Sequence, residues 1–244
     1  LLLCCCCLSS LKNMVLKNKM KAAINLVGVS YSTSGRIRNF SDSYQSLKKN
    51  IENPIRERGY EIDYFLTTYN SDKKEDIIKL YNPVKSTFLD SNFNKLGGGD
   101  VVNSNGKRML IMVHTYLESL KQLKQHTDID LVVSTRFDIL FNLNPFNDFN
   151  YDLSKFNFLF RDYIYLDHPF VIDTLYVFPF KMIDNLIEAI HEMIDNPYKG
   201  VTIAMLNLHN PLSNIIGLEN INIACGDEIH RGDINHIYDL KRTT

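Results

Sequence analysis

Apolar strand-like segments alternate with amphipathic helix-like segments along this sequence, and that order leaves few possible folds. Residues 21–31, 60–70 and 131–141 have the composition of buried strands, whereas residues 41–58 and 108–126 between them carry apolar side chains at helical spacing. A helix between two strands returns the chain to the same edge of the sheet, so consecutive strands can run parallel. The sequence therefore predicts one Rossmann-type α/β domain, with a mixed, mostly parallel sheet and helices on both faces.

Local signals place the ends of several elements. Further strands are predicted at 84–90, 156–166, 173–180 and 221–227, and further helices at 181–194 and 201–218. Gly59 is expected to cap the helix over 41–58, and Pro54 to kink it near its end. Ser71 is expected to be the N-cap of a short helix that closes before Pro83. Pro211 is expected to break the last helix.

Composition and charge limit the function classes. The 244 residues are 45% hydrophobic and 23% charged, with a net charge of −1, which gives no electrostatic footprint for nucleic acid or anionic membrane. Residues 1–20 are expected to be a disordered or extraneous leader, and residues 21–244 the domain. The Gly- and Asn-rich stretch 91–107 is expected to be a long loop.

The cysteines indicate a reducing compartment. Four of the five are consecutive, Cys4–Cys7, and Cys225 lies far away, which is not a disulfide framework. The apolar opening of eight residues is shorter than the roughly 20 residues of a membrane-spanning helix, so no transmembrane segment is expected. A cytoplasmic location is predicted, with peripheral membrane association through palmitoylated cysteines as an open alternative.

Polar residues follow three predicted strands. The segments are "SYSTSGR", "TTYNS" and "STRFD", and they fall at the carboxyl ends of their strands. Ligands of open α/β sheets bind at that edge. We therefore expect these three segments to converge on one site.

Arg136 and Asp138 are the most specific candidates in that set. If residues 131–138 are extended, side chains two apart point to the same face, which supplies one cation and one hard oxygen ligand together. A nucleoside diphosphate requires both, because Mg²⁺ or Mn²⁺ bridges a carboxylate to the phosphates and arginine hydrogen-bonds phosphate. An Arg136–Asp138 ion pair that closes the strand end is an equally weighted alternative.

The other strand ends offer weaker signals. The turn that contains Arg36 could cradle a base or phosphates, although it is neither a G-x-G-x-x-G nor a P-loop motif. Tyr69 could stack on a nucleobase and Asn70 could hydrogen-bond its edge, or both could belong to an ordinary turn. Asp173 opens an apolar strand, where it is either a general base or a cap. Either His230 or His236 in the polar tail could complete a metal shell or contact phosphate, although a solvated tail is the simpler interpretation.

Taken in order, "INLVGVSYSTSGRIRNF", "GYEIDYFLTTYNS", "IDLVVSTRFDILF" and "DTLYVFP" resemble one family. It is the GT-A-fold glycosyltransferases of large algal viruses and of bacterial surface-polysaccharide loci, in which R-x-D replaces the usual D-x-D. The resemblance covers residues 22–242 and implies a nucleoside-diphosphate-sugar donor, with Mn²⁺ or Mg²⁺ on the diphosphate.

The resemblance also implies roles for individual residues. Asp138 matches the metal-binding acid, Arg136 stands in the position of the first acid of D-x-D, and Asp173 falls where an acceptor-side base is sought. The residues that match the nucleotide pocket are Gly28, Ser30, Tyr31, Tyr69 and Asn70. Arginine in place of the first acid leaves one carboxylate for the metal and could itself neutralise the diphosphate.

The function predicted from these features is a metal-assisted glycosyltransferase, a hexosyl- or pentosyltransferase. It would move a sugar to a glycan, a glycoprotein or another hydroxyl acceptor, in the host cytoplasm if the protein is viral. The alternatives are a sugar nucleotidyltransferase, which normally has a Gly-rich basic loop after its first strand, and a non-catalytic nucleotide- or glycan-binding module.

Overall fold

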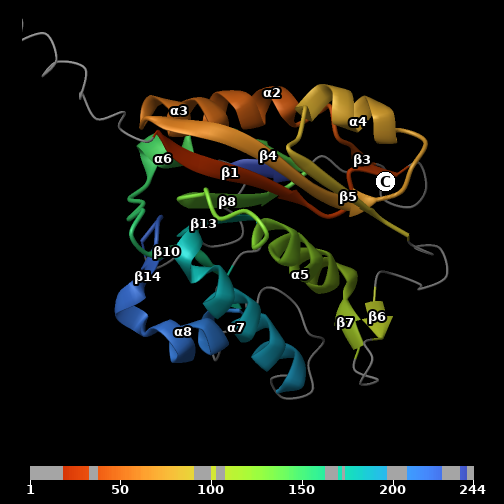
Figure 1. The fold of residues 1–244 in the computed structure, drawn as a ribbon. Helices are drawn as coiled ribbons and strands as arrows, with labels where there is room; N and C mark the ends of the chain where they lie inside the picture. The colour runs from red at the N-terminus through yellow and green to blue at the C-terminus, as the bar shows by residue number, and fades with distance from the viewer. Residues whose placement is uncertain are drawn as a thin grey trace, which may run out of the picture.

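A seven-stranded sheet is the frame of the molecule (Figure 1). The computed structural model describes residues 19–32, 38–90, 100–102, 108–162, 170–171, 174–196, 208–226 and 237–240. In spatial order the strands are β14 (Ile221–Ile223), β10 (Phe156–Phe158), β13 (Leu175–Pro179), β8 (Leu131–Arg136), β1 (Met20–Val27), β4 (Tyr60–Tyr69) and β5 (Lys85–Leu89).

The sheet is mixed and mostly parallel, as predicted. Strands β8, β1, β4 and β5 run parallel to one another, and β10 runs parallel to β14. Strand β13 is antiparallel to both of its neighbours, β8 and β10. The parallel half carries the three polar strand ends that the sequence singled out.

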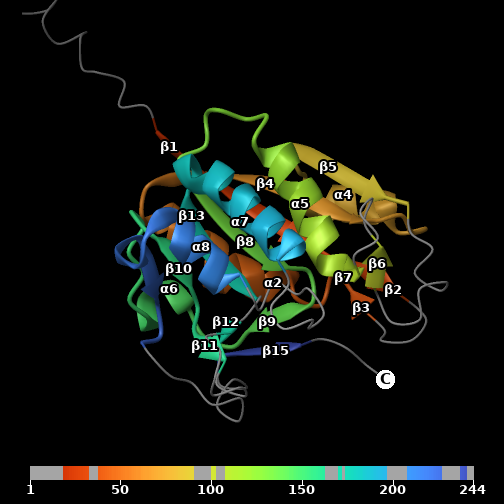
Figure 2. The same ribbon diagram turned by 90° about the horizontal axis from the view of Figure 1, so that it is seen from below.

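Helices cover both faces of this sheet, which also confirms the prediction (Figures 1 and 2). One face carries α2 (Tyr44–Leu47), the π-helical turn η1 (Lys48–Glu52), α3 (Asn53–Glu57) and α4 (Lys74–Tyr81). The other carries α5 (Ile111–Leu123), α7 (Ile183–Asp195) and α8 (His209–Ile216). The described residues thus form one layered α/β body around one sheet.

Alternate residues of the central strand β1 supply the two halves of the core. Ala23 and Val27 pack in the cluster that includes α5 and α7, whereas Ala22, Ile24 and Leu26 pack in the cluster on the α2–α3 side. All five are at most 2% exposed. A strand buried on both faces is apolar at most positions, which explains the apolar run that predicted it. The exception is Asn25, which is fully buried and donates to the hydroxyls of Ser119 and Ser134.

Short strand pairs surround the sheet (Figure 2). They are β2 (Tyr31–Ser32) with β3 (Arg38–Asn39), β6 (Asp100–Val102) with β7 (Arg108–Leu110), β11 (Arg161–Asp162) with β12 (Phe170–Val171), and β9 (Ile139–Phe141) with β15 (Tyr238–Leu240). Two predictions for this region are wrong: residues 100–102 belong to a strand pair rather than the expected loop, and residues 108–110 pair before the helix begins at Ile111.

The first helical segment has a more complex form than predicted. Residues 44–57 are helical, but the π-helical turn η1 directly precedes α3, and Pro54 lies in the first turn of α3. A proline ring lacks the N–H donor and collides with the carbonyl four residues earlier, so a widened turn there accommodates it. Gly59 ends the segment as predicted, with a left-handed φ of 91° and its N–H bonded to Arg56 O at 2.9 Å.

Two predictions about helices are wrong, one for an N-cap and one for a helix break. Helix α4 begins at Lys74 rather than directly after Ser71, and the Ser71 hydroxyl accepts from Lys73 N in the preceding turn. Pro211 lies in the first turn of α8 and does not break it, because the backbone N–H groups of a first turn have no partner within the helix. Residues 201–207 of the predicted helix lie outside the described residues.

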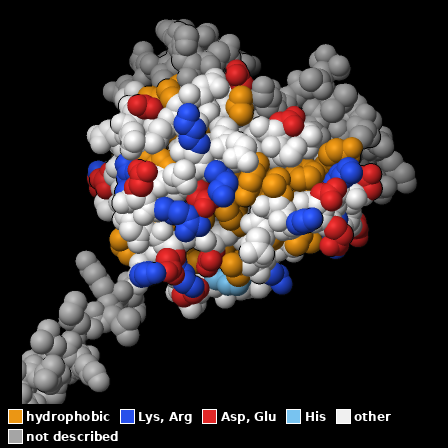
Figure 3. Space-filling model, turned by 90° about the horizontal axis from the view of Figure 1, so that it is seen from above, with side chains coloured by type: hydrophobic (Ala, Val, Ile, Leu, Met, Phe, Trp, Pro, Cys, Tyr) orange, Lys and Arg blue, Asp and Glu red, His pale blue; other side chains and the backbone are white. Residues whose placement is uncertain are grey.

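Lys and Arg alternate with Asp and Glu on the face over α2, α3 and α4 (Figure 3). One ion pair joins Lys73, just before α4, to Asp76 in its first turn. This face therefore has no broad region of one charge, as the net charge suggested. Within the described part of the chain, none of the helices combines the length and apolar character needed to cross a bilayer.

Candidate nucleotide and metal site

The three polar strand ends converge, as the sequence predicted. In the register of the sheet, Val27 at the end of β1 lies beside Thr67 of β4 on one side and Arg136 of β8 on the other. The carboxyl ends of these central strands therefore form one continuous edge. This is the position at which open α/β sheets bind ligands.

Gly28 turns the chain out of β1. Its φ is 101°, and its N–H donates to Thr67 O at 3.1 Å, which ties the turn to β4. A Cβ at this position would lie 3.2 Å from Met112 Cε on α5. Glycine is needed here because the backbone angle and the close approach of Met112 both disfavour a side chain.

Replacing Gly28 tests this requirement. We expect Gly28→Ala to lower the free energy of unfolding by about 1–3 kcal/mol, since alanine is strained at this φ and must also displace Met112. Gly59→Ala is the matched control, because Gly59 has φ 91° and open space around its Cβ position. Urea unfolding should show the larger loss at Gly28. An equal or smaller loss than at Gly59 would contradict the crowding by Met112.

Ser30 and Tyr31 continue the turn. Ser30 is 1% exposed; its N–H donates to Thr68 Oγ1 at 3.1 Å, and the Thr68 hydroxyl donates to Ser30 Oγ at 2.7 Å. Tyr31 is half-buried at the start of β2 and packs beside the α2-side core. The loop after β1 is thus fastened to β4 by side-chain and backbone hydrogen bonds. Arg36 lies outside the described residues.

Tyr69 and Asn70 end β4. Tyr69 is 7% exposed, its hydroxyl shares a hydrogen bond with Thr115 of α5, and burial raises its pKa to about 12. Asn70 is exposed, and its amide donates to Asp90 just beyond β5. Stacking on a base requires an open ring face, so the burial of Tyr69 favours a supporting role for its ring.

Two substitutions at Tyr69 separate support from stacking. We expect Tyr69→Leu to destabilise the fold by roughly 1–3 kcal/mol and Tyr69→Phe by about 1 kcal/mol, through lost packing and a lost hydrogen bond respectively. The affinity for nucleotide, measured by calorimetry on folded protein, should change less than about twofold in both. A tenfold loss in Tyr69→Leu alone would instead assign the ring to the base.

Arg136 and Asp138 form a bidentate ion pair. Arg136 Nε donates to Asp138 Oδ1 and Nη2 to Oδ2, both at 2.9 Å. The side chains are 11% and 4% exposed. Strand β8 ends at Arg136, and a turn at Phe137 and Asp138 leads into β9, so this turn rather than an extended strand brings the two groups together.

The turn that carries Asp138 is held from the α2 side of the sheet. The Ser43 hydroxyl donates to Phe137 O, while Ser46 Oγ and Asn50 Nδ2 donate to Phe141 O at 2.8 and 2.6 Å. Strand β15 pairs with β9 on its other side. These contacts fix the backbone around Asp138.

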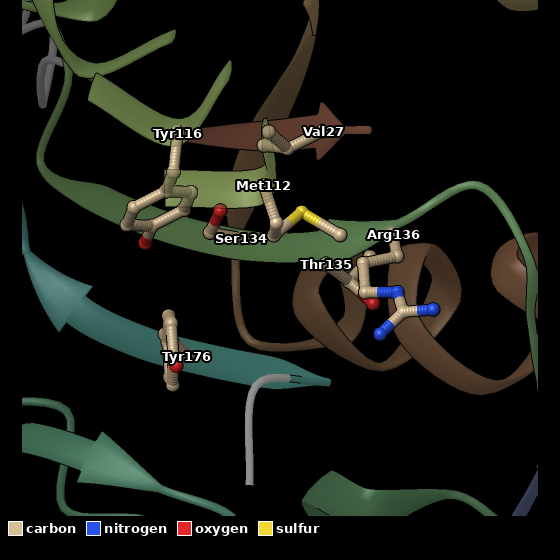
Figure 4. Close-up of a pocket in the computed structure, with 7 residues that line it drawn as sticks. All are labelled: Val27, Met112, Tyr116, Ser134, Thr135, Arg136 and Tyr176. Atoms are coloured by element: carbon tan, nitrogen blue, oxygen red, sulfur yellow. The ribbon is translucent and has the colours of Figure 1, made fainter. Parts of the chain in front are cut away.

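A small pocket adjoins the guanidinium (Figure 4). Its empty volume is about 230 Å³, including space open to solvent, and its lining residues are Val27, Met112, Tyr116, Ser134, Thr135, Arg136 and Tyr176. Arg136 lines this pocket and Asp138 does not. Arg136 is therefore the member of the pair that faces this pocket.

Two tyrosines of this pocket were not predicted from the sequence. Tyr116 comes from α5 and Tyr176 from β13, and their rings meet edge to face with centroids 5.7 Å apart. Burial raises the pKa of the Tyr116 hydroxyl, which is therefore neutral. Tyr116 lies at helical spacing from Val113 and Leu120, so its place on the buried side of α5 can be predicted from the sequence. Its contact with Tyr176 depends on the long-range register of β13, which no local sequence pattern reports.

The donor chemistry at Asp138 suits a hard divalent ion. Mg²⁺ and Mn²⁺ at nucleotide sites are commonly held by one or two carboxylates together with substrate phosphates. Within the described residues, no group of three or more His, Cys, Asp or Glu side chains forms a metal cluster. Asp138 is the described carboxylate at this edge that could hold such an ion, and in this conformation Arg136 donates to both of its oxygens.

Three further candidates lie outside the described residues, namely Asp173, His230 and His236. Thr174, which follows Asp173, is described: its carbonyl accepts from Thr135 Oγ1 at 2.6 Å, at the end of β8.

No protein-family model matches the chain, and no curated protein matches it. Among solved structures, an active-site mutant of LgtC is similar with a TM-score of 0.49 and 10% sequence identity, over 83% of this chain and 72% of that one. A glycosyltransferase involved in the glycosylation of the major capsid of PBCV-1 is similar with a TM-score of 0.44 and 8% identity, over 92% and 94% of the two chains. At these values the likenesses assign no activity to this chain.

Proposed function

We propose that the protein is a glycosyltransferase that transfers a sugar from a nucleoside-diphosphate sugar to a hydroxyl acceptor. The observation that carries the proposal is the Arg136–Asp138 pair, a cation and a carboxylate at the carboxyl edge of β8 beside a pocket. A diphosphate leaving group requires positive charge as it departs, and a buried edge strengthens that interaction. The motif order that resembles GT-A-fold glycosyltransferases supports the same assignment.

The residues divide into four tasks in this proposal. Gly28 and the Ser30 turn allow the chain to pass close to the nucleotide, Arg136 hydrogen-bonds the diphosphate, and Asp138 holds Mn²⁺ or Mg²⁺. The metal, when bound, supplies Lewis-acid stabilisation of the leaving phosphate. Asp173 is the proposed base that takes the acceptor proton if the reaction inverts configuration. The proposed acceptor is a glycan or glycoprotein, and the sugar a hexose or pentose.

A thermal-shift panel tests the proposal. UDP, GDP, CDP and their sugars are each added with and without Mn²⁺, and one base is expected to raise the melting temperature, more strongly with metal. Release of the diphosphate from the matching sugar then establishes transfer chemistry. No stabilisation by any nucleotide would contradict the proposal.

The same panel separates the alternatives. Stabilisation without any turnover would indicate a non-catalytic binding module. Pyrophosphate release from a nucleoside triphosphate and a sugar 1-phosphate would indicate a sugar nucleotidyltransferase.

A further inference from the structure

One end of the pocket beside Arg136 is built from buried polar side chains. The register of the sheet places Asn25 of β1 beside Ser134 of β8, and Ser134 beside Tyr176 of β13. Tyr116 reaches the same end from α5. In Figure 4, Tyr116, Ser134 and Tyr176 line one end of the pocket and Arg136 lines the other.

The Ser134 hydroxyl can form a better hydrogen bond than the one it makes. Asn25 Nδ2 donates to Ser134 Oγ at 3.0 Å and to Ser119 Oγ at 3.1 Å. The Ser134 hydroxyl in turn donates to Asn25 O across 3.5 Å, whereas hydrogen bonds between oxygens are commonly about 2.7–2.8 Å long. A ligand oxygen in the pocket would therefore be a stronger acceptor for the Ser134 proton.

The Tyr116 hydroxyl gives the stronger indication of a ligand. Tyr116 is 4% exposed, and its hydroxyl has no hydrogen-bond partner among the described residues. Ser134 acts on this hydroxyl, since it lowers the Tyr116 pKa in opposition to burial. A buried polar group without a partner is unfavourable, and ordered water commonly satisfies such groups. The pocket therefore lacks one hydrogen-bonding group beside Tyr116 and Ser134.

The size and charge of this end define the chemistry of that group. The enclosed part of the pocket has room for about one water-sized group. The hydroxyls of Tyr116 and Ser134 are neutral, and the cation Arg136 lies at the opposite end. A phosphate is favoured beside Arg136, because burial of an anion among neutral groups is costly. A neutral hydroxyl, which both donates and accepts, fits the end formed by Tyr116 and Ser134.

We propose that Tyr116 and Ser134 form a hydroxyl-recognition site, which holds one water molecule in the free protein and one hydroxyl group of the donor sugar in the complex. Ser134 and Arg136 are two residues apart on β8, which corresponds to about 7 Å along an extended strand. This spacing suits a sugar ring that lies between a phosphate on Arg136 and a hydroxyl on Ser134. The inference rests on the proposed function and names the residues that select the sugar.

The free protein provides the first test. A high-resolution crystal structure should contain one water within hydrogen-bond distance of both Tyr116 Oη and Ser134 Oγ. Tyr116→Phe should lose this water and keep the melting temperature of the unaltered protein, because the deleted hydroxyl has no partner among the described residues. A dry pocket in the unaltered protein would overturn the proposed site.

Selectivity for the sugar provides the second test. Calorimetry compares the nucleoside-diphosphate sugar selected by the thermal-shift panel, its monodeoxy analogues and the bare nucleoside diphosphate. Loss of one particular sugar hydroxyl should weaken binding to the unaltered protein at least about tenfold, because its buried partners are then left unpaired. In Tyr116→Phe, the parent sugar and that analogue should bind within about threefold of each other, since the hydrogen bond that separates them is absent.

Two controls separate recognition from a structural role. The affinity of Tyr116→Phe for the bare nucleoside diphosphate should stay within about twofold of the unaltered protein, since the phosphate end of the pocket is untouched. Tyr151→Phe is the matched variant: the Tyr151 hydroxyl is also buried without a partner among the described residues, but its ring packs on Phe146 in the α2-side cluster. Tyr151→Phe should keep the full discrimination between the sugars.

The outcomes separate this inference from the proposed function. Discrimination that survives in both Tyr116→Phe and Ser134→Ala, or an equal loss of affinity for the bare diphosphate, would overturn the inference and leave the proposed function intact. An effect confined to the KM of the acceptor would move the recognised hydroxyl to the acceptor and overturn its assignment to the donor. Absence of binding by every nucleoside-diphosphate sugar would overturn both the proposed function and the sugar selectivity.

Discussion

Asp138→Asn is expected to lower the release of nucleoside diphosphate from the donor sugar by at least about 100-fold, the loss typical of removing one electrostatic group from a leaving-group site. Asparagine keeps the shape of the side chain but removes the charge that would hold the cation. The effect should appear in kcat, measured at saturating donor and Mn²⁺.

The control for this prediction lies at the other end of the same strand. Asp128, just before β8, pairs with Lys21 at the amino edge of the sheet and is largely exposed. Asp128→Asn should retain kcat within about twofold. Turnover by Asp138→Asn that equals that of the unaltered protein would remove Asp138 from the mechanism.

The second large effect is on stability. Asp138→Ala and Arg136→Ala are each expected to lower the free energy of unfolding by about 3–5 kcal/mol, because each leaves a buried charge without its bidentate partner. The double variant should lose roughly 1–3 kcal/mol less than the sum of the two single losses. Urea unfolding of all four proteins gives the cycle.

A comparison within the same chain calibrates that cycle. Glu52 is similarly buried, but its partner Arg56 is 47% exposed, and Tyr64 also donates to Glu52 at 2.7 Å. Arg56→Ala should therefore cost about 1 kcal/mol or less. Additive losses at Arg136 and Asp138 would mean that the two side chains contribute independently, contrary to the geometry.

The sequence predicted the frame of this site better than its details. Apolar runs buried on both faces identify β1 and β8. Because these strands run parallel, their carboxyl ends lie at the same edge of the sheet, independently of the loop conformations. The ion pair was one of two open alternatives, because the two-residue spacing of Arg136 and Asp138 is compatible with an extended strand or with a turn. The turn at Phe137 is stabilised by Ser43, 94 residues away in sequence, and local patterns do not report such a contact.

Other differences have the same origin. The hydrogen bond between Tyr69 and Thr115 buries a tyrosine that local sequence places at an open strand end. The meeting of Tyr116 and Tyr176 depends on the antiparallel register of β13 with β8. The long-range register of the strands determines which side chains meet in the pocket, whereas local periodicity determines which helices and strands form around it.

Amide hydrogen exchange with and without the nucleoside diphosphate and Mn²⁺ decides whether the nucleotide binds at this edge of the sheet. We expect slower exchange at residues 28–31, 68–70 and 136–138, at the carboxyl edge of β1, β4 and β8. Residues 126–130, at the amino edge, should be unchanged. Protection confined to other segments, with these three unaffected, would contradict a nucleotide site at this edge.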